Sequence, residues 1–381
     1  MRCAYTMNLF DLLSQTCPWL LGEGEESDVV FSCRVRLARN LVGYPFPIRA
    51  TEQDRRLVQD TVQKAAAKAF SKGNNPPNYY YIDIQTLLPL EKEYLFERQL
   101  ISRELVETER THAALIDQQE RFCVMVNEED HVRIHSTGGG FTLRQIWEQI
   151  DQIDNQLGSE LDYVFHEKYG FLTSSATNAG TGMKIYMVLH LPALATTNEM
   201  DKVIRALHKN NLTVRGLRGA GVQALGDFYQ ISNRVTLGKS EEELIVRMID
   251  LIPQITALER QARDFLIKNR REIILDRCSR ALGVLRTAQT ISGLETMTHL
   301  SSLRLGIHTG LLESRIVQSR IGQSNTGHGL DIETVNMLLL HTQPAHLQKM
   351  HGGSLREEQD VVRAAYIRQL LASDAVPVRK S

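Results

Sequence analysis

The sequence predicts an α+β fold followed by a helical domain. Residues 122–135 have the pattern of a strand, a tight acidic turn and a second strand, because apolar residues precede Asn127 and apolar and polar residues alternate after Asp130. From about residue 265 onwards the periodicity is mostly helical, and few strand patterns remain. We therefore expect three parts, an N-terminal segment over 1–28, a mixed domain over 29–262 and a helical domain over 263–381.

Composition limits the classes of partner and compartment. A chain of 381 residues with 42% hydrophobic and 23% charged residues is typical of a globular protein with a large core. The net charge of −1 provides no basic field for nucleic acid, so any anion site must come from a local group of cations. No apolar run approaches the length of a membrane span, and Asp11 and Gln15 interrupt the first apolar residues, which makes a poor signal peptide.

The five cysteines are far apart and have no CxxC spacing. This pattern argues against a zinc ribbon or a disulfide framework and favours a reducing compartment. We therefore expect a cytoplasmic protein, without a membrane or nucleic-acid partner, and predict no side chain as a metal ligand.

Residues 28–39 contain two arginines, Arg34 and Arg36, at a spacing of two. In a strand, residues at this spacing lie on the same face. Two guanidinium groups on one face suit a polyphosphate. The alternative is an exposed strand with a basic surface at the edge of a sheet.

Local patterns place the other elements in order. Helices are expected over 52–71, 90–100, 146–157, 199–209 and 357–372, and strands over 79–84, 185–191 and 228–233. Ser240 and Glu243 form a capping box that begins a long helix, in which Pro253 is expected to cause a kink. A loop is expected over 319–329. Gly138–Gly140 lacks the Gly-Lys-Ser/Thr of a phosphate-binding loop, which favours a flexible loop.

Two stretches are rich in small residues. Residues 169–184 contain glycine and hydroxyl residues that allow backbone N–H groups to approach a ligand closely, and a plain connecting loop is the alternative. Residues 213–224 contain a GxGxxA match. A strand pattern follows it, whereas a dinucleotide fingerprint begins a helix, so we expect a mobile loop around Arg215 and Arg218.

The acidic turn over 127–133 places carboxylates beside Arg133. Such a turn can hold a cation next to an anion. A solvated hairpin tip is the alternative interpretation.

These stretches, in this order, resemble the phosphagen kinases, the ATP:guanidino phosphotransferases. Within that group the chain is most similar to the bacterial protein-arginine kinases (McsB). The similar stretches are 32–39, 127–133, 177–182, Arg215-Gly216, 231–233 and 237–243, and the tail adds Gln343-Pro344 and Gly352-Gly353. The resemblance covers most of residues 29–262 and implies an antiparallel sheet flanked by helices, followed by a helical domain.

The resemblance also implies ATP and Mg²⁺ as the phosphoryl donor and its ion. Arginines surround the nucleotide phosphates in the family, and Arg34, Arg36, Arg133 and Arg215 match those positions, while Lys184 stands where arginine is usual. The residues then expected at the nucleotide are Ser32, Cys33, Arg34, Val35, Arg36, Gln99, Arg133, Lys184, Ile185, Tyr186, Met187, Val188, Arg215, Gly216, Leu217, Arg218, Gly219 and Ala220.

The same resemblance assigns Glu129 as the catalytic residue. An acceptor guanidinium is a poor nucleophile that must be oriented and must lose a proton, and a carboxylate can do both. Only about 28 residues precede the first arginine motif, so the acceptor site is expected to be uncovered and to suit exposed arginines of substrate proteins. The family implies a homodimer and an association with an activator protein and protease machinery.

The chain departs from the family pattern at several positions. Ser175 stands in place of a cysteine, and Ala220 stands where a second carboxylate is usual. Gln99 replaces a histidine. In the tail the phosphoarginine-binding pattern Arg-Asp-x-x-Arg-Ala becomes Gln359, Asp360, Arg363 and Ala364 with two residues between. Two hypotheses follow: a protein-arginine kinase of reduced activity, and a pseudokinase or phosphoarginine-binding adaptor that acts through partners.

Overall fold

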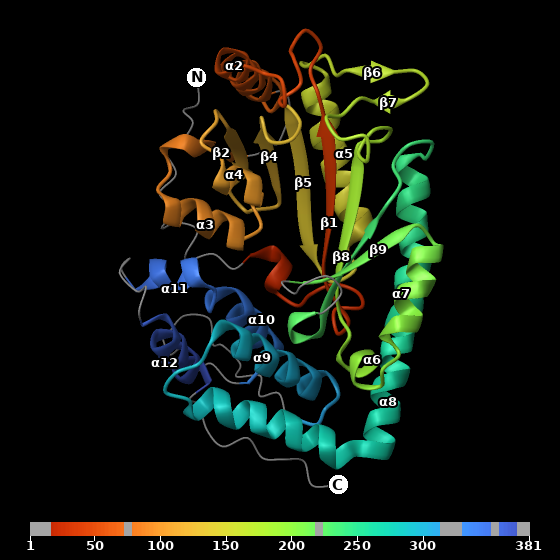
Figure 1. Cartoon of the computed structure of the whole chain (residues 1–381), viewed down its shortest axis with the longest axis vertical. Helices are drawn as coiled ribbons and strands as arrows, with labels where there is room; N and C mark the ends of the chain where they lie inside the picture. Colours follow the sequence, from red (N-terminus) through yellow and green to blue (C-terminus); the bar gives the residue numbers. More distant parts are fainter. Residues whose placement is uncertain (1–16, 72–77, 218–223, 313–329, 352–357, 372–381) are drawn as a thin grey trace.

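The computed structural model describes residues 17–71, 78–217, 224–312, 330–351 and 358–371. Its centre is an eight-stranded sheet in the order β2-β3-β4-β5-β1-β8-β10-β9, and every neighbouring pair is antiparallel (Figure 1). The strands are β1 (Val30–Arg39), β2 (Tyr79–Asp83), β3 (Ala113–Asp117), β4 (Phe122–Val126), β5 (Val132–Gly139), β8 (Met183–His190), β9 (Leu212–Gly216) and β10 (Phe228–Asn233). A small hairpin, β6 (Phe165–His166) with β7 (Gly170–Phe171), lies apart from it. The predicted antiparallel sheet is confirmed.

β1 lies inside the sheet, between β5 and β8. Arg34 is opposite Thr137 on one side and Tyr186 on the other. The alternative of a basic edge strand is therefore wrong. The residues that alternate with the arginines, Cys33, Val35 and Leu37, are fully buried on the opposite face, as expected for a strand inside a sheet.

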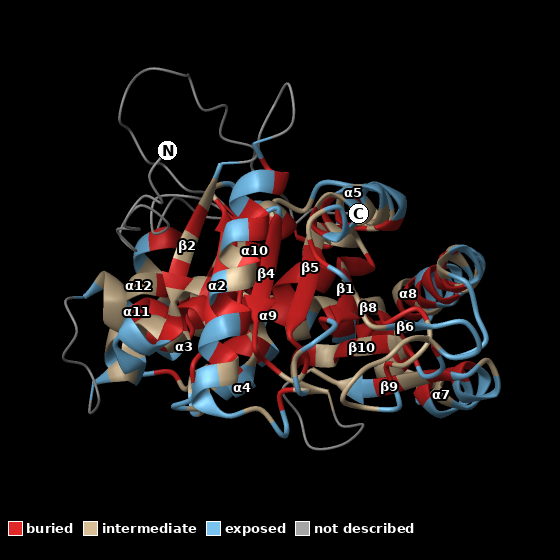
Figure 2. Ribbon diagram, turned by 90° about the horizontal axis from the view of Figure 1, so that it is seen from above, coloured by how far each residue is buried: buried red, intermediate tan, exposed pale blue. Residues whose placement is uncertain are grey.

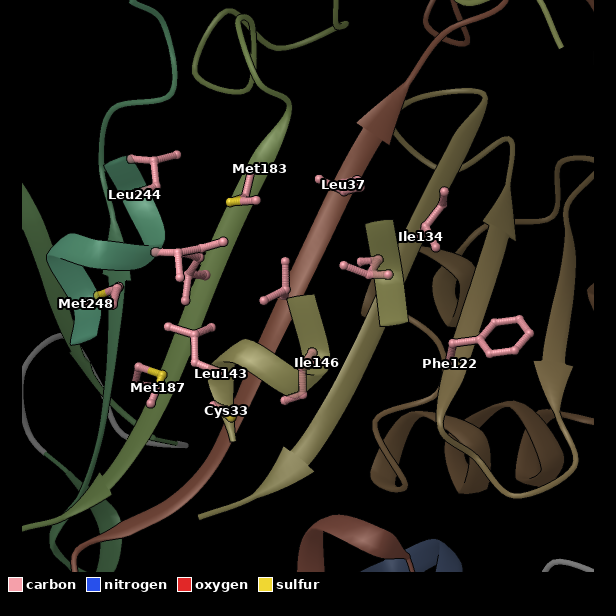
Figure 3. Close-up of a cluster of buried hydrophobic side chains, with 14 of the residues drawn as sticks. Cys33, Leu37, Phe122, Ile134, Leu143, Ile146, Met183, Met187, Leu244 and Met248 are labelled. Atoms are coloured by element: carbon pink, nitrogen blue, oxygen red, sulfur yellow. The ribbon is translucent and has the colours of Figure 1, made fainter. Parts of the chain in front are cut away.

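That opposite face of the sheet is a hydrophobic layer covered by helices that include α2 (Glu52–Ala69), α5 (Leu143–Gly158) and α8 (Glu241–Thr287). Figure 3 shows Leu143 and Ile146 of α5, and Leu244 and Met248 of α8, against side chains of the central strands. Burial of this layer provides most of the driving force for the fold. The central strands β1, β3, β4, β5 and β8 are mostly buried, while the outward faces of helices such as α7 are exposed (Figure 2).

The remaining helices lie around the sheet and in the C-terminal region (Figure 1). Before α8 they are η1 (Pro18–Leu20), α2 (Glu52–Ala69), η2 (Ile84–Thr86), α3 (Pro89–Glu97), α4 (Arg103–Glu107), α6 (Pro192–Thr196), α7 (Met200–Lys209) and η3 (Leu225–Asp227). After α8 they are α9 (Gly293–His308), α10 (Ile332–His341), α11 (Pro344–Met350) and α12 (Gln359–Leu371). The C-terminal helices have a hydrophobic core of their own, which also includes Trp19 and Leu20 from the N-terminal segment.

Most predicted elements occur within a few residues of their expected limits, and the capping box of Ser240 and Glu243 is confirmed. Two local expectations are wrong. Pro253 lies within α8 without a break, and the non-helical residue is Arg270 (φ −142°, ψ 30°), where Figure 1 shows α8 changing direction. Ile252 and Ile255 are buried beside Pro253, so packing holds the helix there in spite of the missing donor.

The second wrong expectation concerns the glycines at the end of β5. Gly138 and Gly139 pair with Cys33 and Ser32 of β1, so they extend a strand and do not form a flexible loop. α8 also continues across the expected domain boundary at 262 and 263. The expected loop over 319–329 lies outside the described residues. No helix in the described ranges is long and apolar enough to cross a membrane.

Candidate active site

A cavity of about 620 Å³ lies on the face of the sheet opposite α5 and α8. Strand residues whose side chains point to this face of the sheet line the cavity. They include Ser32, Arg34, Arg36, Arg133, His135, Tyr186, Val188 and Gln230. Its other walls come from the end of α3, from Leu217 and Phe228, and from Met297, Leu339 and Leu340 of α9 and α10. One end of the cavity is therefore cationic and the other is apolar.

Arg34 is a half-buried cation at the polar end. Its Nε donates to Thr137 Oγ1 at 3.0 Å, and its Nη2 donates to the backbone oxygen of Gln99 at 3.3 Å and to the side-chain oxygen of Gln99. All of these acceptors are neutral, and no carboxylate of the described residues forms an ion pair with Arg34. Burial, with a smaller contribution from Arg36, lowers the pKa of Arg34 to about 10.

Arg36 lies beside Arg34 on the same face, with its guanidinium 5.5 Å from the centre of the Tyr186 ring. Its Nε is buried without a hydrogen-bond partner in the described part of the chain. Burial and the neighbouring charge of Arg133 lower the pKa of Arg36. Two half-buried guanidinium groups without a carboxylate partner form a site that an anion would stabilise.

Arg133 is the third arginine of this face and, unlike Arg34 and Arg36, it is paired with carboxylates. Its guanidinium forms ion pairs with both Glu128 and Glu129. Glu128 is buried, whereas the side chain of Glu129 is 38% exposed. The turn therefore holds a cation against the cavity and presents one carboxylate to solvent.

Four contacts fix the shape of this turn. Asn127 has a left-handed backbone (φ 60°), and its N–H donates to the oxygen of His131 at 3.0 Å. Arg55 of α2 donates to the oxygen of Asn127 at 3.2 Å. Asp130 accepts from Asn40 Nδ2 at 2.8 Å and from the N–H of Ser174 at 2.7 Å. The hairpin tip is thus attached to α2, to the end of β1 and to the loop over 172–182.

The loop over 172–182 brings a second polar group to Glu129. Asn178 Nδ2 donates to Glu129 Oε2 at 3.3 Å. The loop can approach so closely because Gly180 (φ +105°) lies against the backbone oxygen of Thr236, where a Cβ atom would be only 2.5 Å away. Ser175 contacts Thr177, with 2.8 Å between the two hydroxyl oxygens.

The structure separates the predicted nucleotide residues into two groups. The side chains of Ser32, Arg34, Arg36, Gln99, Arg133, Tyr186, Val188 and Leu217 line the cavity. The side chains of Cys33, Val35, Ile185 and Met187 are buried in the hydrophobic layer on the other face, so only their backbones lie near the cavity. Gly216 ends β9. Arg218, Gly219 and Ala220 lie outside the described residues.

Lys184 and Arg215 stand on the same sheet face but outside the cavity lining. Lys184 Nζ donates to the backbone oxygens of Asn233 at 3.0 Å and Arg234 at 3.3 Å. Burial and Arg36 lower the pKa of Lys184. Arg215 is exposed on the edge strand β9, opposite Gln230.

The predicted phosphoarginine residues lie in α12. Arg363 is buried, forms an ion pair with Asp360 and donates to the backbone oxygens of Thr342 at 3.0 Å and Ile291 at 2.9 Å. Ala364 is also buried, Gln359 is half-buried and Asp360 is exposed. In this arrangement Arg363 holds the helical region together, and Asp360 is the charged group that reaches solvent.

Sequence reasoning missed three polar residues of the site, Glu128, His135 and Asn178. His135 is two residues after Arg133, so the strand alternation could have placed it on this face. Burial and Arg34 hold the pKa of His135 well below its usual range, and its Nε2 lies 3.2 Å from the oxygen of Gln99. No sequence signal distinguishes the buried Glu128 from the exposed Glu129.

The described residues contain no group of three or more His, Cys, Asp or Glu side chains that could hold a metal ion. Two carboxylates belong to the cavity lining, and both have partners: Glu128 is paired with Arg133, and Glu97 contacts His346.

Comparison with known proteins identifies the family. The model described as "ATP:guanido phosphotransferase, C-terminal catalytic domain" matches residues 58–262, and the one described as "Protein-arginine kinase McsB C-terminal domain" matches residues 271–380. A protein-arginine kinase of Pelotomaculum thermopropionicum is 38% identical over 93% of this chain and 96% of its own length. One from Caldanaerobacter subterraneus is 39% identical over 90% and 96%, and one from Bacillus pumilus is 38% identical over 95% and 94%.

This chain belongs to the protein-arginine kinase family. Solved structures agree on the fold of this family member. A lombricine kinase has a TM-score of 0.54 at 23% identity, covering 65% of this chain and 72% of that one. The duplicated taurocyamine kinase of Schistosoma mansoni has a TM-score of 0.55 at 22% identity, covering 69% and 37%. The predicted family and fold are thus confirmed.

Lys184→Arg tests one departure of this family member from its relatives. A lysine provides a point charge, whereas arginine provides a planar fork that can bind phosphate and still reach a carbonyl. We expect nucleotide binding at least about 3-fold tighter, measured by calorimetry with MgADP. Lys168→Arg, on the exposed β6–β7 hairpin, is the matched control. Unchanged affinity in Lys184→Arg would assign Lys184 to the carbonyls of Asn233 and Arg234 alone.

Proposed function

We propose that this protein transfers the γ-phosphoryl group of ATP to arginine side chains of proteins. One observation carries the proposal: Arg34 and Arg36 face a cavity without carboxylate partners, while Glu129 lies beside it and reaches solvent. Family membership supports the same conclusion, since the relatives named above are protein-arginine kinases.

The arginine face would bind the phosphates. Phosphoryl transfer depends mainly on positioning and on neutralising charge over the phosphoryl oxygens, which arginines can do. Arg34 and Arg36 offer unused donors at one end of the cavity, and Arg133 lies between them and the acidic turn. The apolar end, with Val188, Leu217 and Phe228, would then receive the nucleotide base.

Mg²⁺ is proposed to arrive with the nucleotide. This ion keeps several waters and binds substrate phosphates together with one or two carboxylates, so it does not need a protein cage. Such binding agrees with the described residues, in which no cluster of metal ligands occurs. The ion would help to neutralise the phosphate charge.

Glu129 would bind the acceptor. Its carboxylate can accept N–H bonds from a guanidinium group and receive the proton that the reacting nitrogen must lose. The nitrogen then forms a bond to the γ-phosphorus, the bond between that phosphorus and the β–γ bridging oxygen breaks, and ADP leaves. Because the Glu129 side chain is 38% exposed, an arginine on the surface of another protein can approach it.

The surroundings of the reaction are proposed from the family alone. We propose that the protein acts as a cytoplasmic homodimer, together with an activator protein and with protease machinery that receives the modified proteins. Light scattering of the purified chain tests the dimer, and a change of rate on adding a candidate activator tests the partner.

The decisive experiment incubates purified protein with MgATP and an arginine-rich substrate protein, and detects acid-labile phosphate on arginine by mass spectrometry under non-acidic conditions. Phosphoarginine formation supports the enzyme. Nucleotide binding without transfer supports the alternative, a pseudokinase or phosphoarginine-binding adaptor. That alternative is motivated by Ala220, Ser175 and Gln359, where the family pattern has Glu, Cys and Arg.

Ala220→Glu should increase the rate of transfer. The family pattern has a carboxylate at this position, which with Glu129 would complete a fork around the guanidinium, and one charged hydrogen bond can change a rate by about 10- to 100-fold. Ser175→Cys should add to the effect, because a thiol beside a cation can become a thiolate. The rate of phosphoarginine formation in parent, single and double variants provides the measurement. A parent as fast as Ala220→Glu would show that Ala220 is no defect.

A further inference from the structure

We propose that Glu97 is a positioning residue, which fixes the phosphate-binding Arg34 by anchoring the end of α3 on helix α11. The inference rests on the proposed function, because it assigns Arg34 to the nucleotide phosphates. Glu97 is the last residue of α3 and lies in the cavity lining. Figure 1 shows α3 and α11 as neighbours, although more than two hundred residues separate them in the chain.

The first link joins Glu97 to α11. Glu97 Oε1 accepts from the backbone N–H of Ala345 at 2.9 Å, and Oε2 accepts from that of His346 at 3.0 Å. His346 Nδ1 lies 2.7 Å from Oε2. One buried carboxylate thus caps the first turn of α11, where free N–H groups and the helix dipole favour an anion.

The second link is the residue after Glu97. Arg98 is buried and forms an ion pair with Glu120 at 2.7 Å. Its guanidinium also lies over the ring of Tyr94. Breaking a buried pair leaves an uncompensated charge, so Arg98 prevents the end of α3 from rotating freely.

The third link is Gln99, which has a left-handed backbone (φ 65°) that is unusual for glutamine. This turn directs both the backbone oxygen and the side-chain oxygen of Gln99 at Arg34. His135 contacts the same backbone oxygen. Three consecutive residues therefore connect a helix of the C-terminal region to the guanidinium that faces the cavity.

The chain of contacts predicts a specific defect. Without the Glu97 carboxylate, α11 loses its cap and the turn at Gln99 loses its anchor, so Arg34 is held less precisely. A misplacement of about 1 Å in a positioned group has large effects on binding and transfer. Glu97→Ala should therefore raise the Kd for MgADP and the KM for ATP about 10-fold, without changing the KM for the arginine substrate.

The matched control comes from the same helix pair. Glu91 of α3 forms an ion pair with Lys349 of α11 at 3.7 Å, at the end of α3 that is remote from Gln99. Glu91→Ala removes a carboxylate between α3 and α11, together with the bond that Glu91 accepts from the N–H of Leu88 at the start of α3, but leaves the turn at Gln99 intact. We expect its nucleotide affinity to equal that of the parent, and its melting temperature provides a reference for loss of an α3–α11 contact.

Calorimetry with MgADP on the parent, Glu97→Ala, Gln99→Ala and the double variant tests the inference. If Glu97 acts through Gln99, the loss of affinity in the double variant is smaller than the sum of the losses in the two single variants, because Gln99→Ala keeps only the backbone oxygen that contacts Arg34. Parental affinity in Glu97→Ala would overturn the proposal, and so would losses that add. If Glu97→Ala does not fold, the double-mutant test is repeated with Glu97→Gln, which keeps the shape and removes the charge. A parent that binds no MgADP would instead refute the proposed function.

Discussion

Glu129→Gln is expected to lower the rate of arginine phosphorylation by about 100-fold or more, since a positioned general base contributes roughly 10²- to 10⁴-fold. Glutamine keeps the size of the side chain but loses the negative charge and the ability to receive the proton of the acceptor guanidinium. Arg133 would retain its ion pair with the buried Glu128, so the turn should keep its shape. The rate of phosphoarginine formation at saturating MgATP measures the effect.

The same variant should bind MgADP with nearly parental affinity, because Glu129 does not belong to the cavity lining. Glu107→Gln, an exposed carboxylate at the end of α4, is the matched control and should have the parental rate. Transfer that is unaffected by Glu129→Gln would remove Glu129 from the chemistry and would leave the acidic turn a structural support for Arg133.

Arg34→Ala is the second variant with a large expected effect. It deletes a guanidinium whose charge-assisted hydrogen bonds to phosphate contribute about 1.5–3 kcal/mol each, so loss of two such bonds corresponds to at least about 100-fold in affinity. Calorimetry with MgADP measures the loss. The same affinity in parent and variant would place the phosphates away from Arg34.

Without nucleotide, Arg34→Ala should not destabilise the folded protein. Burial lowers the pKa of Arg34 to about 10, below its value in the unfolded chain, so the charged form disfavours the folded state. This cost in the free energy of folding is fully present at every pH below about 10, and it decreases only as the pH rises through that value. Arg34→Ala should therefore unfold at a temperature no lower than the parent in the absence of nucleotide, but MgADP should no longer stabilise it. A much lower melting temperature without nucleotide would contradict this account.

Local patterns predicted much of the fold because they depend on near neighbours. The strand over 228–233 and the turn at Asn127 follow from alternation and turn residues. The position of β1 in the middle of the sheet did not follow, since it depends on pairing with β5 and β8 from distant parts of the chain. Pro253 was misjudged for a similar reason, because tertiary packing and not the local rule decides where α8 breaks.

The residues of the candidate site also fall into those that local patterns predicted and those that depend on tertiary contacts. The spacing of Arg34 and Arg36 predicted a shared face, and the same rule assigns Cys33 and Val35 to the hydrophobic layer. The resemblance to the family assigned all four residues to the nucleotide site, because similarity of sequence records positions in the chain and not the direction in which side chains point. The roles of Glu128 and Asn178 could not be predicted, since each depends on a contact that only the folded chain creates.

The burial of the cysteines has a consequence for redox chemistry. Ser175 replaces the thiol that the family pattern places near the acceptor, and Cys17, Cys33, Cys123 and Cys278 are all buried. Burial raises the pKa of each of these thiols, to about 11 for Cys33 and Cys278. Peroxides and alkylating agents react with exposed thiolates, which these residues do not provide. The four described cysteines should therefore resist peroxides and alkylating agents, so these thiols provide no redox control of the transfer proposed here.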